Sequence, residues 1–217
     1  MKNTALLFTI AFVLALAACN QPSTPTETPA KAEDAPAAST TAENATPPDS
    51  AAMMKAWMDY ATPGDMHAML AKFDGEWNGD MTMWMAPDAP PEKSTGVSVN
   101  KMILGGRYQE SKHTGTFGGM PFEGVGTLAY DNTKKKFINT WIDNFGSGIM
   151  VMEGTWDTAN YTMHLSGKQV DPVSGQDFEV RQIFKIIDDN TQLMEMFSKY
   201  PSAPEYKSLE IKFTRKI

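Results

Sequence analysis

The chain has 217 residues with a formal net charge of −7, and 21% of them are charged. An acidic chain of this kind has no basic excess for binding phosphates, so we expect no nucleic-acid partner. The one cysteine, Cys19, excludes an intrachain disulfide. With a signal and a linker subtracted, one domain of about 150–170 residues remains, which is long enough to bury a core.

Residues 1–19 predict a secretory signal of the lipoprotein type. Lys2 precedes an apolar run, Ala5 to Ala15, which is too short to span a membrane as a mature helix. The run ends in Leu16-Ala17-Ala18-Cys19, which resembles the lipobox of bacterial lipoproteins. We therefore expect acyl chains on Cys19 to anchor the mature protein to a membrane. An ordinary signal peptide with a chance cysteine is the alternative interpretation.

Residues 20–50 predict a disordered linker. They contain six prolines and almost no large apolar residue, so nothing offsets the entropy lost on ordering. Asn20 follows the lipobox cysteine where an Asp would favour retention in the inner membrane. We therefore expect a cell-envelope location, with the protein on the outer membrane and facing the periplasm.

Residues 51–74 predict two short helices that cap the folded domain. In residues 51–61, Met54, Trp57 and Met58 lie on one helical face. Thr62-Pro63-Gly64 ends this helix, and Asp65 is placed to cap a second one with its own apolar stripe. We expect both stripes to pack on the domain.

Residues 75–217 predict an all-β domain, a single antiparallel meander of about ten strands. The connections are short and rich in Gly, Asp and Asn, so they leave no room for crossover helices. Closure into a lipocalin-like β-barrel would remove the exposed edges and leave a cavity for one small ligand. The predicted strands are Glu76–Met85, Lys93–Ile103, Arg107–Phe117, Phe122–Tyr130, Lys136–Phe145, Ile149–Asp157, Tyr161–Val170, Asp177–Ile187, Gln192–Tyr200 and Glu205–Lys216.

Several short motifs occur in order from about Pro63 to the C-terminus. They are His67-x-x-Leu70-x-x-Phe73-x-Gly75-x-Trp77, Gly105-Gly106-Arg107-Tyr108, Phe122-Glu123-Gly124-x-Gly126, Tyr130-Asp131-Asn132, Lys135-Lys136-Phe137, Trp141-Ile142-Asp143 and Thr214-Arg215-Lys216. Together they resemble the bacterial domain-of-unknown-function family numbered 1579 (DUF1579). Ala129 stands where the family pattern has a glycine. The family carries no established activity, so the resemblance bears on the fold and not on the chemistry.

Polar side chains on the inner faces of the predicted strands are the candidates for ligand binding. Asp143 lies two residues from Trp141, so both side chains point the same way and can hold a polar group beside an aromatic wall. The structural alternative makes Asp143 a turn-end acceptor and Trp141 a core residue. The candidate ligand-binding residues are Trp77, Arg107, His113, Asn139, Trp141, Asp143, Gln182 and Glu195.

Patterns typical of enzymes and metal sites are missing from the sequence. There is no His-Glu-x-x-His, no Gly-x-Ser-x-Gly and no phosphate loop, and the three histidines lack metal-ligand spacing. We predict no metal and no cofactor. The minor alternative is Cu(I) held by Met81, Met83 and Met85, since thioethers suit that ion, although methionine is also a flexible core filler.

These patterns predict a lipid-anchored envelope protein that binds a small apolar or amphiphilic molecule without catalysis. An enzyme that uses a cavity carboxylate or histidine as acid or base is one alternative. A structural envelope protein with a fully packed barrel is the other.

Overall fold

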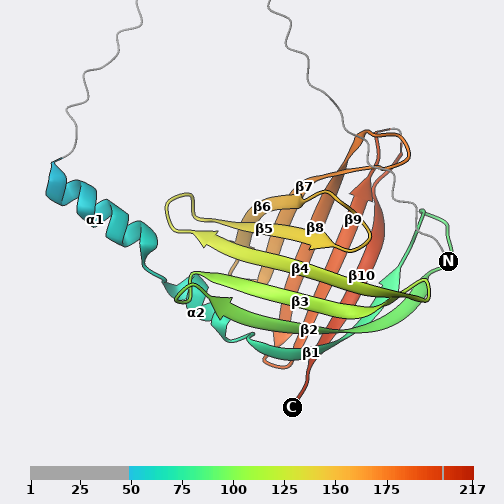
Figure 1. Ribbon diagram of the computed structural model, residues 1–217, viewed down its shortest axis with the longest axis horizontal. Coiled ribbons are helices and arrows are strands. Elements are labelled where there is room, and N and C mark those ends of the chain that lie inside the picture. The colour runs from blue at the N-terminus through green and yellow to red at the C-terminus, as the bar shows by residue number, and fades with distance from the viewer. Residues whose placement is uncertain (1–48, 202) are drawn as a thin grey trace, which may run out of the picture. The chain divides into compact units, whose positions relative to one another are not determined.

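A computed structural model describes residues 49–201 and 203–217, which form two helices followed by ten strands (Figure 1). The predicted signal, Cys19 and most of the predicted linker lie outside the described residues. The helices are α1 (Ser50–Ala61) and α2 (Asp65–Ala71). The strands are β1 (Gly75–Met83), β2 (Glu92–Ile103), β3 (Tyr108–Phe117), β4 (Met120–Asp131), β5 (Lys136–Asp143), β6 (Met150–Asp157), β7 (Thr162–Val170), β8 (Asp177–Asp188), β9 (Thr191–Lys199) and β10 (Tyr206–Arg215).

The ten strands form one closed antiparallel barrel, in which each strand pairs with its neighbours in the chain (Figure 1). The first strand also pairs with the last, with Trp77 opposite Arg215 and Met83 opposite Leu209. No strand in the described residues is left with an open edge. The structure confirms the prediction of an all-β, lipocalin-like barrel.

The turns explain the meander. Gly118 and Gly119 join β3 to β4 with φ angles of 54° and 78°, the left-handed conformation that a two-residue hairpin turn requires. β1 ends at Met83, earlier than predicted, because the following connection contains Pro87, Pro90 and Pro91, which cannot continue a strand ladder.

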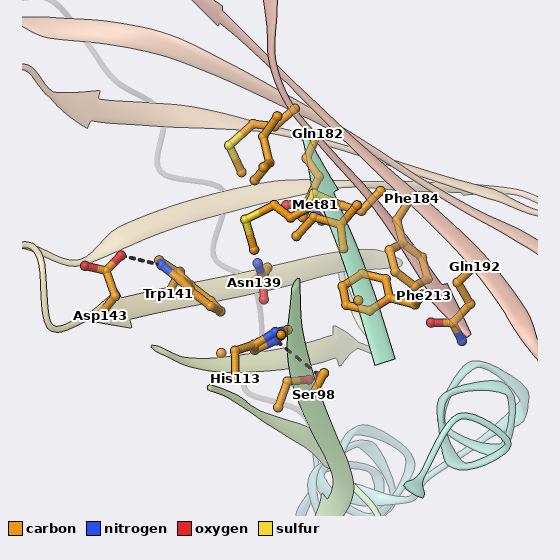
Figure 2. Close-up of a pocket in the computed structure, with 18 of the residues that line it drawn as sticks. Met81, Ser98, His113, Asn139, Trp141, Asp143, Gln182, Phe184, Gln192 and Phe213 are labelled. Atoms are coloured by element: carbon orange, nitrogen blue, oxygen red, sulfur yellow. Dashed lines mark hydrogen bonds between the residues drawn. The ribbon is translucent and has the colours of Figure 1, made fainter. Parts of the chain in front are cut away.

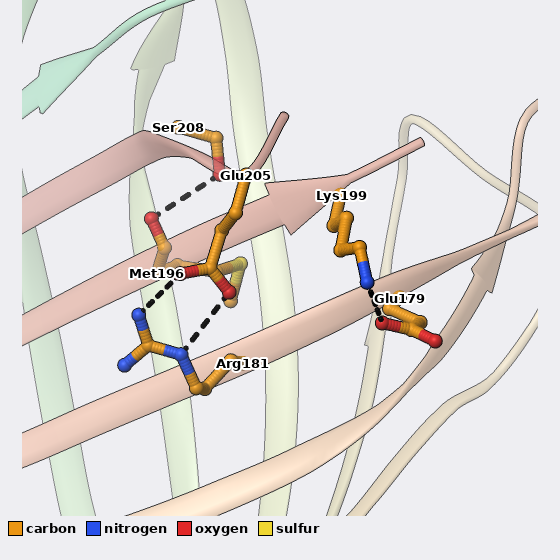
Figure 3. Close-up of polar contacts among 6 residues, drawn as sticks. All are labelled: Glu179, Arg181, Met196, Lys199, Glu205 and Ser208. Atoms are coloured by element: carbon orange, nitrogen blue, oxygen red, sulfur yellow. Dashed lines mark hydrogen bonds and ion pairs between the residues drawn. The ribbon is translucent and has the colours of Figure 1, made fainter. Parts of the chain in front are cut away.

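Alternation along each strand separates an apolar interior from a charged exterior. One core cluster is built around Phe137, Met152 and Leu165, and a second around Trp77 and Phe213. The outer wall carries ion pairs, shown in Figure 3 for β8 and the residues next to it. Nε and Nη2 of Arg181 donate to the Glu205 carboxylate, at 3.2 and 2.6 Å, and Lys199 Nζ lies 3.4 Å from Glu179.

α2 closes one end of the barrel. His67 and Leu70 are buried, and the Leu70 carbonyl accepts a hydrogen bond of 2.8 Å from Gln109 Nε2 in β3. Just after α2, the Asp74 carboxylate accepts hydrogen bonds from the Met102 backbone N–H at 2.8 Å and from Gln109 at 3.1 Å. These bonds fix α2 to β2 and β3.

α1 differs from the expectation that its apolar stripe packs on the domain. None of its residues is buried against the described chain, and Trp57 is 64% exposed. Its contact with the barrel is polar: Asn132 Nδ2, in the β4–β5 turn, donates to the carbonyls of Tyr60 at 3.0 Å and Thr62 at 2.8 Å. Among the described residues, no helix is long and apolar enough to cross a membrane.

Candidate functional site

The barrel encloses a cavity of about 530 Å³. It begins at α2, where Leu70 and Phe73 form its floor, and reaches the opposite end, where the exposed side chains of Met85 and Phe145 belong to its lining. We call this second end the mouth. Many lining residues are methionines from several strands: Met81, Met83, Met150, Met163, Met194 and Met196. The interior is therefore mainly apolar and is not packed solid.

Trp141 in β5 forms a rigid aromatic wall of this cavity (Figure 2). Its ring lies over Gly124, where a Cβ would come within 2.4 Å of the indole, and stacks on Phe122 at an interplanar angle of 17°. Its Nε1 donates to Asp143 Oδ2 at 2.8 Å. Asp143 Oδ1 accepts from the Phe145 backbone N–H at 2.9 Å. Asp143 thus ends the strand and orients Trp141 at the same time.

His113 in β3 faces Trp141 inside the cavity. The two rings are T-shaped with centroids 5.0 Å apart, and Phe213 lies edge-on at 6.2 Å on the other side. His113 Nε2 is 3.5 Å from Ser98 Oγ, at the limit of a hydrogen bond (Figure 2). Burial inside the barrel lowers the pKa of His113 to about 4, so the ring is uncharged at neutral pH.

The remaining polar groups of the cavity are mainly uncharged. Asn139 and Gln182 line it, as predicted from alternation, and so does Gln192, which the sequence analysis did not single out. Gln192 is 2% exposed, and its Nε2 has no hydrogen-bond partner in the described part of the chain. The sequence could have identified Gln192 as a cavity residue, because alternation along β9 places Gln192, Met194 and Met196 on one face.

The sequence from residue 62 to residue 215 matches the family described as "Protein of unknown function (DUF1579)". The chain belongs to this family. The match confirms the resemblance seen in the motifs, and it covers α2 and all ten strands. No curated protein matches the chain.

Two solved structures resemble the fold of this DUF1579 protein. Rv2717c from M. tuberculosis has a TM-score of 0.55 and 13% identity, and the match covers 72% of this chain and all of that one. The S-type phycobiliprotein lyase CPES from Guillardia theta has a TM-score of 0.52 and 9% identity, and the match covers 74% of this chain and 97% of that one. At these identities the likeness concerns the fold alone.

Five of the eight predicted binding residues meet in the cavity of the DUF1579 protein. They are His113, Asn139, Trp141, Asp143 and Gln182. Met81 and Met83 also line it, and Met85 lies at the mouth with 63% of its surface exposed. In residues 49–201 and 203–217, no group of three or more His, Cys, Asp or Glu residues is arranged to hold a metal ion.

The other three predicted residues lie elsewhere, and their placement in the cavity was wrong. Trp77 is 0% exposed in the core, with Arg215 over its ring at 4.3 Å. Arg107 is an exposed residue of the β2–β3 turn, where its Nη1 donates to the Leu104 carbonyl. Glu195 faces outward and pairs with Lys207 at 2.9 Å, because its neighbours in β9 take the inward positions.

Proposed function

We propose that this DUF1579 protein binds one small apolar or amphiphilic molecule inside its barrel without changing it chemically. The observation that carries this proposal is the cavity of about 530 Å³, lined by methionines and closed at one end by α2. Natural ligand pockets are of this size and kind, with apolar walls and a few placed polar groups. Trp141, fixed by Phe122 and Asp143, supplies a wall that needs no reordering when a ligand enters.

Binding fits the cavity better than acid–base catalysis does. The cavity carboxylate of Asp143 already has a structural role. Each of its oxygens accepts a hydrogen bond from a protein group, at 2.8 and 2.9 Å, and one of these bonds orients Trp141. Asp143 is also the one carboxylate among the described residues that line the cavity.

We further propose that the barrel is held at the cell envelope by acyl chains on Cys19, on the outer membrane facing the periplasm. The support is the sequence Leu16-Ala17-Ala18-Cys19 at the end of an apolar run. Cys19→Ala should then leave an unprocessed precursor or a soluble chain. A mature-length Cys19→Ala protein that still fractionates with membranes would overturn this part.

The cavity proposal is tested with a neutral fluorescent probe, N-phenyl-1-naphthylamine, whose emission rises in apolar surroundings. Met194→Trp adds bulk to the cavity, whereas Leu193→Trp adds the same bulk to the outer face of the same strand. We expect Met194→Trp to lose most of the probe response and Leu193→Trp to keep it, with circular dichroism showing both folded. Equal responses in the two variants would rule out the cavity as the binding site.

A further inference from the structure

In the described part of the chain, the deep half of the cavity contains a buried polar atom without a hydrogen-bond partner, Nε2 of Gln192. Gln192 stands at the start of β9, opposite Phe213 of β10 and Ile186 of β8, near the end that α2 closes. Figure 2 shows its amide beside Phe213. A buried amide N–H without a partner loses its hydrogen bonds to water and regains none, so an unfilled donor here calls for an acceptor.

Gln109 shows what a structural glutamine looks like in this barrel. It is as buried as Gln192, but its Nε2 donates to the Leu70 carbonyl at 2.8 Å and to Asp74 at 3.1 Å. Both glutamines belong to the cavity lining, but the Nε2 of Gln192 makes no such link among the described residues. The terminal torsion of glutamine is broad, so the amide can turn its N–H groups toward an acceptor in the cavity.

The charges around the cavity restrict what that acceptor can be. Among the described lining residues there is no lysine and no arginine, and Asp143 is the one acidic residue. A carboxylate or phosphate buried here would have no counter-charge and would pay a large desolvation cost. A cation would bring no acceptor for an N–H donor. The acceptor that remains is an uncharged oxygen of the ligand.

We propose that Gln192 is the hydrogen-bond donor for an uncharged ligand with a carbonyl or ether oxygen at its deep end, the rest of the ligand being apolar. This inference rests on the proposed function, since it names the chemical class that the cavity takes. It also gives the ligand a direction: the oxygen lies toward α2 and the apolar remainder extends past Trp141 to the mouth.

The test measures displacement of N-phenyl-1-naphthylamine by three chains of equal length, 2-decanone, decane and decanoate. The unaltered protein should bind the ketone about tenfold more tightly than the alkane, the value of one net hydrogen bond, and decanoate most weakly. Gln192→Met keeps the side-chain length and removes the donor, so the ketone should lose its advantage and bind no more tightly than the alkane. Gln176→Met, the same change at an exposed glutamine outside the cavity lining, should keep the tenfold preference.

The outcomes separate this inference from the proposed function. If the probe and the alkane bind but the ketone has no advantage, a water molecule satisfies Gln192 and the inference is overturned while the binding function stands. If neither the probe nor any chain binds, the proposed function falls with it. A preference that survives Gln192→Met, or that Gln176→Met abolishes equally, also overturns the assignment.

A measurement on the unaltered protein covers the case in which Gln192→Met does not fold. The infrared stretch of a carbon-13-labelled carbonyl in bound 2-decanone should lie at lower frequency than in alkane solvent, because the amide donates to it. A bound ketone whose carbonyl stretch matches that in alkane has no donor, and this result would contradict the proposal.

Discussion

The two ends of the barrel are held together by different forces. At the α2 end, polar groups that are mostly half-buried make directed hydrogen bonds: Asp74 and Gln109 fix the helix, and Arg215 donates to the carbonyls of Asp74 at 2.8 Å and Lys72 at 2.7 Å. At the mouth, aromatic rings contact one another. Phe145 lies 5.5 Å from Phe117 and is itself 44% exposed.

This difference indicates which end stabilises the fold and which end lets a ligand enter. Hydrogen bonds to buried carbonyls resist separation, because breaking them leaves polar groups unpaired. Contacts between partly exposed rings are weaker and allow side-chain motion without such a cost. We therefore assign the stability of the fold chiefly to the α2 end, and the entry of a ligand to the mouth.

The largest effect is expected at the closed end. Trp77→Ala removes a fully buried ring, its hydrogen bond to the Phe73 carbonyl and the surface on which Arg215 rests, so it should cost about 3–5 kcal/mol of unfolding free energy. Urea denaturation measures this loss. A decrease below about 1 kcal/mol would show that the closed end does not carry the stability.

Acid should destabilise the protein through the cavity, between the two ends. Burial lowers the pKa of His113 from 6.5 to about 4, so the unfolded chain binds more protons between these values. Stability should be full above about pH 6.5 and fall as the pH drops to about 4, by on the order of 3 kcal/mol. Urea midpoints for His113→Gln should change much less over this range. A parallel decline in both proteins would assign the acid sensitivity to other groups.

At the mouth, a substitution should affect ligand binding more than it affects stability. Phe145→Ala should cost about 1 kcal/mol of stability, because the ring is partly exposed, and should weaken binding of the neutral probe about fivefold by removing apolar contact. Tyr161→Ala, a change of an exposed aromatic residue in the β6–β7 turn at the other end, is the control and should leave probe affinity unchanged. Equal losses in the two variants would remove the distinction between the ends.

The smallest effect is expected for α1. A chain that begins at Thr62, where the family match also begins, loses a helix with no buried residue and keeps α2 and the whole barrel. Its melting temperature should shift by less than about 5 °C, corresponding to about 1 kcal/mol. A larger shift measured by circular dichroism would mean that α1 contributes to the closed end.

The strands were predictable because each is bounded by turn residues and alternates between the two faces. The burial of the two helices was less predictable, since both carry an apolar stripe: Met54, Trp57 and Met58 in α1, and Met66, Met69 and Leu70 in α2. Burial of such a stripe is decided by what lies opposite it. Leu70 of α2 meets the barrel end, and Trp57 of α1 meets nothing in the described chain.

The cavity residues were predictable where large aromatic residues alternate along one face of a strand, as for Asn139, which lies between Phe137 and Trp141 in β5. β9 is ambiguous, because apolar residues occur on both of its faces: Met194 points inward, whereas Phe197 points outward under the Arg181 guanidinium at 4.0 Å. This is why Glu195 was assigned to the wrong face and Gln192 was overlooked. The prediction for Arg107 was wrong for another reason: this residue lies in a turn, where alternation does not indicate which way a side chain points.

The seam between β1 and β10 has a consequence for how the chain acquires its structure. Every other strand pair joins neighbours in sequence and can form as soon as a hairpin is made, but Trp77 meets Arg215 only when the final strand is available. Contacts between such distant residues slow folding, because the loop must close before they form. During synthesis the sheet therefore keeps two unpaired edges until β10 is complete, and this interval is when the chain is most exposed to aggregation.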